Sequence, residues 1–91
     1  MQKVEILKDS MLEVNLNTIV KVKEFVHSTS RHDQDIFITD GKYIIDAKSI
    51  MGVFSLDLTK NLYVYTEEQN ILDNTELVND LTKFTLNNQW I

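Results

Sequence analysis

The side chains best placed to carry a proton or a phosphoryl group are His27, His32 and Ser49. The chain contains no cysteine, so it has no thiolate nucleophile, no disulfide and no thiolate metal site. Two histidines are too few for a histidine-rich metal site. Several carboxylates are spread along the chain rather than clustered: Asp57, Glu67, Glu68 and Asp73. We therefore expect neither a bound metal nor a cofactor.

The two histidines lie in, and just after, a predicted amphipathic helix. His27 falls off the apolar stripe of that helix, as is typical of a solvated surface residue. His32 follows the C-terminal end, where a cationic ring would complement the negative end of the helix dipole. The sequence favours these structural roles over a reactive imidazole.

Ser49 begins a short run that is rich in apolar residues. A helix of about one and a half turns fits this run, because a serine Oγ can accept a hydrogen bond from an unpaired N–H of the first turn. The apolar residues of the run are Ile50, Met51, Val53 and Phe54. Two interpretations remain open, since these residues could pack in the core or form a docking surface for a partner.

The rest of the chain predicts a small set of elements around this run. Alternating apolar residues indicate strands, and a three- and four-residue apolar spacing indicates helices. The expected order is a strand at 12–16, a helix at 19–31, strands at 36–39 and 43–46, the short helix, a strand at 61–65 and a helix at 73–84. Two helices with single apolar stripes must cover one face of the sheet.

The apolar stripes of the two long helices contain the residues that we expect in the core. That of the first comprises Ile19, Val22, Phe25, Val26 and Thr29, and that of the last comprises Leu77, Val78, Leu81 and Phe84. Residues 1–91 are expected to form one domain, with 1–10 as an extension that includes a possible added edge strand. Residues 87–91, with Trp90, are expected to be a frayed tail.

Caps and turns should fix the ends of these elements. Asn17 is expected to cap the first long helix, and Asp73 with Glu76 three residues later fits a capping box for the last. Asp40-Gly41 indicates a hairpin with a type I′ turn, in which both central residues have positive φ.

Charge and hydropathy exclude several classes of partner. The net charge of −5 argues against unspecific nucleic-acid binding, and against bases stacking on a predicted stripe of Tyr63 and Tyr65. No apolar run approaches the ~20 residues that span a bilayer. Residues 1–8 lack the apolar region of a signal peptide, so we expect a cytoplasmic protein that does not bind membranes.

The stretch Lys48-Ser49-Ile50-Met51-Gly52-Val53, within this order of elements, closely resembles HPr, the histidine-containing phosphocarrier of the bacterial sugar phosphotransferase system. The resemblance runs from about Phe25 to Tyr65, and in element order over nearly the whole chain. It implies an α+β fold, the HPr-like open-faced β-sandwich: a four-stranded antiparallel sheet with three helices on one face, in the order β-α-β-β-α-β-α.

The sequence departs from this resemblance at the active site of the family. HPr carries its phosphoryl group on a histidine of a His-Ala-Arg-Pro motif at the start of its first helix. Here Thr18 falls near the histidine position and Val20 near the arginine position. A threonine hydroxyl is not a nucleophile at neutral pH without an activating base, and no base is adjacent. We therefore expect neither an enzyme nor a histidine phosphocarrier of the usual kind.

Ser49 matches the regulatory serine of the Gram-positive branch of the family. The resemblance implies phosphorylation of this serine by a dedicated kinase/phosphorylase. It also implies docking to a catabolite-control transcription regulator or a phosphotransferase-system component through Lys48, Ile50, Met51 and Phe54. Two other hypotheses stay open: an interaction module that does not depend on phosphorylation, and a residual phosphocarrier that uses His27 or His32.

Overall fold

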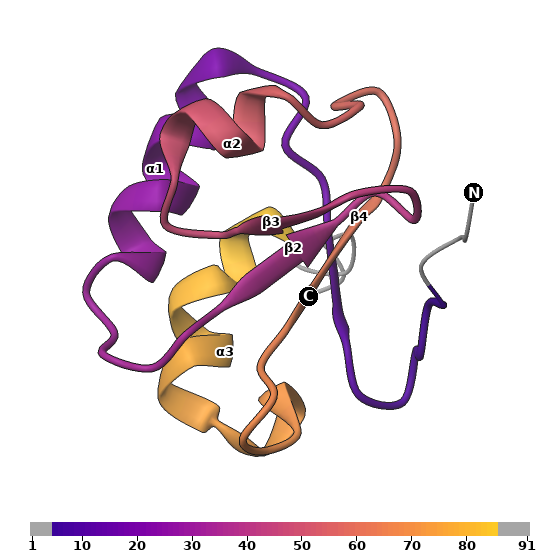
Figure 1. Cartoon of the computed structure of the whole chain (residues 1–91). Helices are drawn as coiled ribbons and strands as arrows, with labels where there is room; N and C mark the ends of the chain where they lie inside the picture. The colour runs from indigo at the N-terminus through magenta and orange to yellow at the C-terminus, as the bar shows by residue number, and fades with distance from the viewer. Residues whose placement is uncertain (1–4, 86–91) are drawn as a thin grey trace.

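The computed structural model describes residues 5–85 of the 91-residue chain. Figure 1 shows its strands and helices. In chain order they are β1 (Leu12–Val14), α1 (Ile19–Thr29), β2 (Phe37–Thr39), β3 (Ile44–Asp46), α2 (Ile50–Phe54), β4 (Leu62–Tyr65) and α3 (Thr75–Leu81), with 3₁₀ turns at Ile71–Asp73 (η1) and Thr82–Phe84 (η2). The predicted order β-α-β-β-α-β-α is confirmed.

The four strands form one antiparallel sheet in the order β1-β4-β2-β3. Its register places Val14 opposite Leu62, and Ile38 opposite both Val64 and Ile45. Because successive side chains alternate between faces, these residues share one face of the sheet. The neighbouring positions in each strand point to the other face. This is the predicted four-stranded antiparallel sheet with helices packed on one side.

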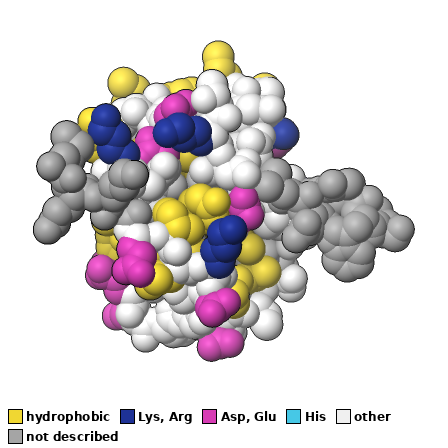
Figure 2. Space-filling view, turned by 90° about the vertical axis from the view of Figure 1, so that its right-hand side faces the viewer, with side chains coloured by type: hydrophobic (Ala, Val, Ile, Leu, Met, Phe, Trp, Pro, Cys, Tyr) yellow, Lys and Arg dark blue, Asp and Glu magenta, His cyan; other side chains and the backbone are white. Residues whose placement is uncertain are grey.

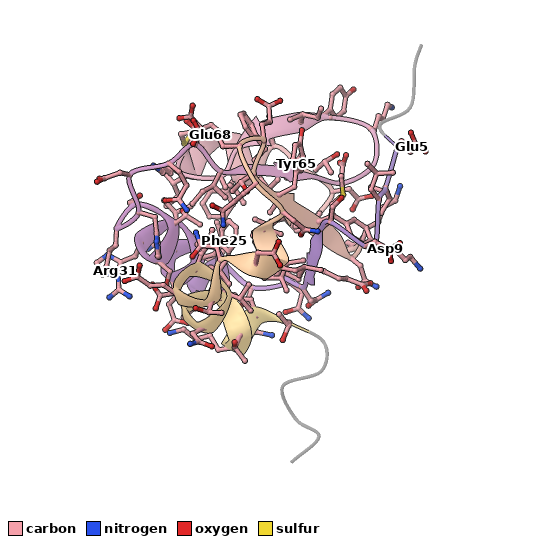
Figure 3. All side chains as sticks on the ribbon, turned by 90° about the horizontal axis from the view of Figure 1, so that it is seen from below. Glu5, Asp9, Phe25, Arg31, Tyr65 and Glu68 are labelled. Atoms are coloured by element: carbon pink, nitrogen blue, oxygen red, sulfur yellow. The ribbon has the colours of Figure 1, made fainter. Side chains whose placement is uncertain are left out.

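The core lies between that sheet face and the helices. Figure 3 shows Phe25 of α1 in this space, with the strands on one side and the helices on the other. The Phe25 ring meets the Phe84 ring edge-on, with centroids 5.6 Å apart at 80°. Leu77 and Leu81 of α3 are fully buried. The apolar stripe of α3 is therefore confirmed, and so is most of the stripe of α1.

The first turn of α1 differs from the prediction in two respects. Thr18, and not Asn17, caps the helix, since its Oγ1 accepts the Lys21 N–H at 3.1 Å. Ile19 was expected in the core but is 63% exposed. Helical periodicity predicts the direction of a side chain around the axis, but not whether another element reaches that turn.

The C-terminal end of α1 lies at Thr29, two residues before the predicted end at Arg31. The Thr29 hydroxyl donates to the Val26 carbonyl and, at 2.8 Å, to the Ala47 carbonyl. The N–H groups of Arg31 and His32 then bond three positions back, to Ser28 O and Thr29 O. This tighter pattern is how helix ends commonly satisfy their last carbonyls.

The β2–β3 connection is a loop of four residues. The prediction of a type I′ turn is therefore wrong. Gly41 has φ of 93°, but no other type of residue within 5–85 has positive φ, so Asp40 does not adopt the required conformation. Instead the Asp40 carboxylate accepts the N–H groups of Lys42 and Tyr43, both at 2.9 Å. A side chain that bonds the backbone ahead of it closes the loop in place of the tighter turn.

The cap of α3 is also shifted by one residue. Asn74 accepts the Leu77 N–H at 3.1 Å, so the predicted capping box of Asp73 and Glu76 is wrong. Asp73 instead ends η1, which is capped by Asn70. Aspartate and asparagine are nearly equal as caps, so composition could not choose between adjacent positions.

The described part of the N-terminal extension, residues 5–10, contains no strand. It forms a turn in which Ser10 N–H bonds the Leu7 carbonyl at 2.9 Å. The outer edge of β1 meets residues from the other end of the chain: Thr85 pairs with Val14, and the Asn15 N–H donates to the Phe84 carbonyl at 2.8 Å. The predicted tail at 87–91, with Trp90, lies outside the described residues. Within 5–85, no helix is long and apolar enough to cross a bilayer.

Candidate functional site

Ser49 is the N-cap of α2, as the sequence predicts. Its Oγ accepts the Gly52 N–H at 3.1 Å, and its side chain is half-buried. A Cβ at position 52 would lie 2.5 Å from Ile45 Cγ2 and 3.1 Å from Ser49 Oγ. The missing side chain of Gly52 therefore lets the first turn close against the serine hydroxyl and β3.

The segment before Ser49 is held to the end of α1. The Asp46 carboxylate accepts the Lys48 N–H at 2.9 Å, and Lys48 Nζ donates to the carbonyl of His32. Thr29 of α1 bonds the carbonyl of Ala47, which is fully buried. These contacts hold the backbone that leads into the half-buried Ser49.

Apolar side chains are exposed along α2, from its first residue to its last. Met51 is 77% exposed, and Ile50 and Phe54 are each 37% exposed, whereas Val53 is fully buried. Each of the two interpretations that the sequence left open, core packing and an exposed surface, therefore holds for part of the run. Val53 belongs to the core, and the other three residues face solvent on a helix that Ser49 starts.

The first turn of α1 extends this apolar surface. Ile19 and Val20 are each 63% exposed, and α1 packs against α2. Hydrophobic side chains project at the top of Figure 2, which is the end of the molecule where α2 and the start of α1 lie in Figure 1. We call these five residues the α1–α2 patch: Ile19, Val20, Ile50, Met51 and Phe54.

Ile19 and Val20 were missed as surface residues by the sequence analysis. Val20 lies off the apolar stripe of its helix, and this was the signal that could have marked it. Ile19 gave no such signal, because it keeps the spacing of the stripe. Its exposure depends on where the first turn of α1 lies relative to the sheet, and tertiary packing sets that position.

Thr18, the residue near the position of the missing histidine, is exposed at the start of α1. Its Oγ1 accepts the backbone N–H of Lys21. This contact is that of a helix cap, and within residues 5–85 no acidic or basic side chain is bonded to Thr18. Nothing in its contacts activates the hydroxyl as a nucleophile.

The two histidines differ sharply in environment. His27 is exposed, as expected. His32 is buried, and its Nε2 lies 2.7 Å from Asp80 Oδ2 on α3, which Arg31 also contacts at 3.1 Å. Hydrogen bonds from His32 and then from Arg31 lower the pKa of Asp80. His32 thus joins α1 to α3, a role that sequence could not reveal across 48 positions.

The face of the sheet opposite the helices carries aromatic side chains. Phe37 and Tyr65 stack with centroids 5.4 Å apart, and the Tyr63 hydroxyl donates to Glu13 Oε2 at 3.4 Å. Partial burial, and then the charge of Glu13, raise the pKa of Tyr63. The tyrosines of the predicted stripe are half-buried by these neighbours rather than fully exposed.

Among residues 5–85, no three His, Cys, Asp or Glu side chains are grouped so that they could hold a metal ion. No protein-family model and no curated protein matches the chain. A solved structure does: that of Crh from Bacillus subtilis, a catabolite repression containing protein that forms a dimer with a swapping domain. The likeness covers 94% of this chain and 97% of that chain, with a TM-score of 0.55 and 24% identity. The chain therefore has the HPr-like fold, an open-faced β-sandwich.

Proposed function

We propose that this protein is an HPr-like regulatory adaptor whose docking to protein partners is switched by phosphorylation of Ser49. The observation that carries the proposal is the half-buried Ser49 hydroxyl at the start of α2, beside the exposed side chains of Ile50 and Met51. The name of the structural neighbour, a catabolite repression protein, supports a regulatory role over an enzymatic one.

A phosphate on Ser49 would change the charge at the edge of the α1–α2 patch. It adds about −1.5 to −2 charges and three strong acceptor oxygens. A phosphate oxygen can replace the hydroxyl as acceptor of the Gly52 N–H, so α2 keeps its cap. A partner with arginine beside an apolar pocket would then gain charge-assisted hydrogen bonds that the unmodified protein lacks.

The proposed partners are a serine kinase/phosphorylase and a transcription regulator or phosphotransferase-system component, all in the cytoplasm. Histidine phosphotransfer does not form part of the proposal. Thr18 stands near the position of the family's histidine and serves as a cap. The ring of His32, which is buried, is engaged by Asp80.

The proposal is tested by incubating the protein with an HPr kinase/phosphorylase and ATP, then measuring intact mass. We expect a gain of about 80 Da, the mass of one phosphoryl group, on the wild type and none on Ser49→Ala. Ser55→Ala, at the other end of α2, is the matched control and should still gain the mass. An unchanged wild-type mass, or a gain that persists in Ser49→Ala, contradicts the proposal.

A second candidate is an adaptor that needs no phosphorylation. The 77% exposure of Met51 favours it, because an apolar patch can bind a partner without any modification. In this case Met51→Glu abolishes capture of the partner while Ser49→Asp does not. Leu72→Glu is the control, since Leu72 is also exposed but lies on η1 outside the patch.

A further inference from the structure

The edge strand β3 is unpaired on its outer side. The order β1-β4-β2-β3 places it at the end of the sheet, next to α2, and no segment within residues 5–85 pairs with its outer edge (Figure 1). The opposite edge of the sheet, on β1, is met instead by Phe84 and Thr85. An open strand edge presents N–H and C=O groups that can pair with a further strand.

The backbone groups of β3 that face this edge belong to Ile44 and Asp46. In the β2–β3 register Ala47 follows opposite Ile36, and its N–H donates to the Ile36 carbonyl at 2.8 Å. Bonded and non-bonded pairs alternate along an antiparallel ladder, so Ile45 also directs its N–H and C=O toward β2. Those of Ile44 and Asp46 therefore point away from the sheet.

The side chains along this edge are apolar at the centre and oppositely charged at the ends. Tyr43 and Ile44 are 50% and 49% exposed. Lys42 and Asp46 flank them, and both are exposed. Residues 42–46 thus have no net charge, although the whole chain has a net charge of −5, and they contain no proline that would prevent pairing.

One two-fold register satisfies the charges of two such edges. Two copies of β3 paired antiparallel about Ile44 place Lys42 of each copy opposite Asp46 of the other, because the interface of a symmetric dimer repeats every contact. Opposite charges across a strand pair are stabilising, and like charges are destabilising. Centring the pair on Ile45 would instead place Lys42 opposite Lys48, and centring it on Asp46 would place that carboxylate opposite itself.

The same register matches the hydrogen-bonding groups that are available. Ile44 would exchange N–H···O bonds with Ile44 of the second copy, and the Asp46 N–H would donate to the Lys42 carbonyl. The remaining pair of facing groups is already satisfied within each copy. The Asp46 carbonyl accepts the Ser49 N–H at 3.0 Å, and the Lys42 N–H donates to the Asp40 carboxylate at 2.9 Å.

We propose that this protein binds a second copy of itself edge to edge through β3, in a two-fold register centred on Ile44 that joins the two four-stranded sheets into one. Both Ile44 side chains lie on the open face of the sheet, so the helices of the two copies share the other face. The proposal goes beyond the adaptor function and does not depend on it, because neither the Ser49 hydroxyl nor the α1–α2 patch makes these contacts.

The first test is sedimentation velocity of the full chain from about 10 μM to about 2 mM, since a short strand pair is expected to give a weak dimer. Amide hydrogen exchange measured by NMR at both ends of this range then locates the interface. Dimer formation should protect the amides of Ile44 and Asp46 and leave that of Ile45 unchanged, because Ile45 already bonds to β2. A monomer at every concentration, or a dimer without this protection, overturns the proposal.

The second test exchanges the charges between copies. Lys42→Asp alone and Asp46→Lys alone each place like charges opposite one another, and each should weaken the dimer by about tenfold or more. An equimolar mixture of the two variants regains opposite charges at both pairs and should associate within about threefold of the wild type. Lys8→Asp, in the exposed turn before β1, makes the same charge change and is the control. A mixture that associates no better than the single variants, or equal weakening by Lys8→Asp, overturns the register.

A third variant covers the case in which Asp46→Lys fails to fold, since the Asp46 carboxylate also accepts the Lys48 N–H. Ile44→Lys changes an exposed side chain and places two ammonium groups opposite each other at the centre of the interface. This variant should remain folded by circular dichroism and stay monomeric up to about 2 mM. A folded Ile44→Lys protein that dimerises as the wild type does would overturn the proposal.

Discussion

At the scale of single residues, Asp80 has contacts that make stability depend on pH. Hydrogen bonds from His32 and Arg31 lower the pKa of Asp80 below the ordinary aspartate value of 3.8. A carboxylate whose folded pKa is lowered stabilises the fold above its unfolded pKa, and this contribution is lost as the pH falls through the folded value. The pH range in which this stabilisation is lost therefore lies below about pH 4.

Asp80→Asn should reduce stability modestly at neutral pH, on the order of 0.5–1 kcal/mol, since the pair is partly exposed and screened by solvent. The variant should also lose less stability than the wild type between pH 5 and pH 2. Urea unfolding at several pH values measures both effects. Glu68→Gln, at an exposed position, serves as control. Parallel pH profiles for the wild type and Asp80→Asn would contradict the argument.

Ser49 has a structural role besides the proposed regulatory one. Ser49→Ala removes the acceptor of the Gly52 N–H and should cost about 1 kcal/mol of unfolding free energy, as loss of other caps does. Ser49→Asp keeps an acceptor oxygen and should cost less. Chemical denaturation of the two variants checks the order. A Ser49→Ala protein as stable as the wild type would mean that the Ser49 cap does not contribute to the unfolding free energy.

At the scale of elements, α2 depends on a glycine in its first turn. Alanine ordinarily favours a helix over glycine by about 1 kcal/mol. Here the new Cβ would lie 2.5 Å from Ile45 Cγ2 on β3, so the Ile45 side chain or the backbone of α2 must shift. The steric effect exceeds the gain in helix propensity.

Gly52→Ala should therefore destabilise the fold by roughly 1–3 kcal/mol, the usual cost of overpacking. A double-mutant cycle with Ile45→Ala isolates the cause, because that change removes the opposing methyl group. The cost of Gly52→Ala should fall in the Ile45→Ala background. An unchanged cost there would show that the contact with Ile45 is not responsible.

At the scale of the whole molecule, stability depends on the packing of α1 and α3 under the sheet. Leu81 is fully buried in the core that also contains Phe25 and Phe84. Leu81→Ala should cost about 2–5 kcal/mol, from lost burial and the cavity left behind. Net stabilities are about 5–15 kcal/mol, so this variant should be severely destabilised or unfolded.

Thermal and chemical denaturation measure this effect. Val78→Ala on the same helix is the matched control, since Val78 is only partly buried and should cost less. A Leu81→Ala protein that melts within a degree or two of the wild type would contradict the packing.

Local sequence pattern determined the order of elements, the buried stripes with Phe25 and Leu81, and the capped helix at Ser49. These follow from side-chain periodicity and from hydrogen bonds that span three or four residues. The choices of Thr18 over Asn17 and of Asn74 over Asp73 were not determined, because adjacent residues offered nearly equal caps.

Only the tertiary structure decided which apolar residues remain exposed and which charges meet. Ile19 has the spacing of a core residue, but it is 63% exposed and no other element within residues 5–85 covers it. His32 and Asp80 are 48 positions apart, yet their atoms lie 2.7 Å from each other. Coverage and long-range contact depend on how helices pack over the sheet, and periodicity within one element carries no information about its neighbours.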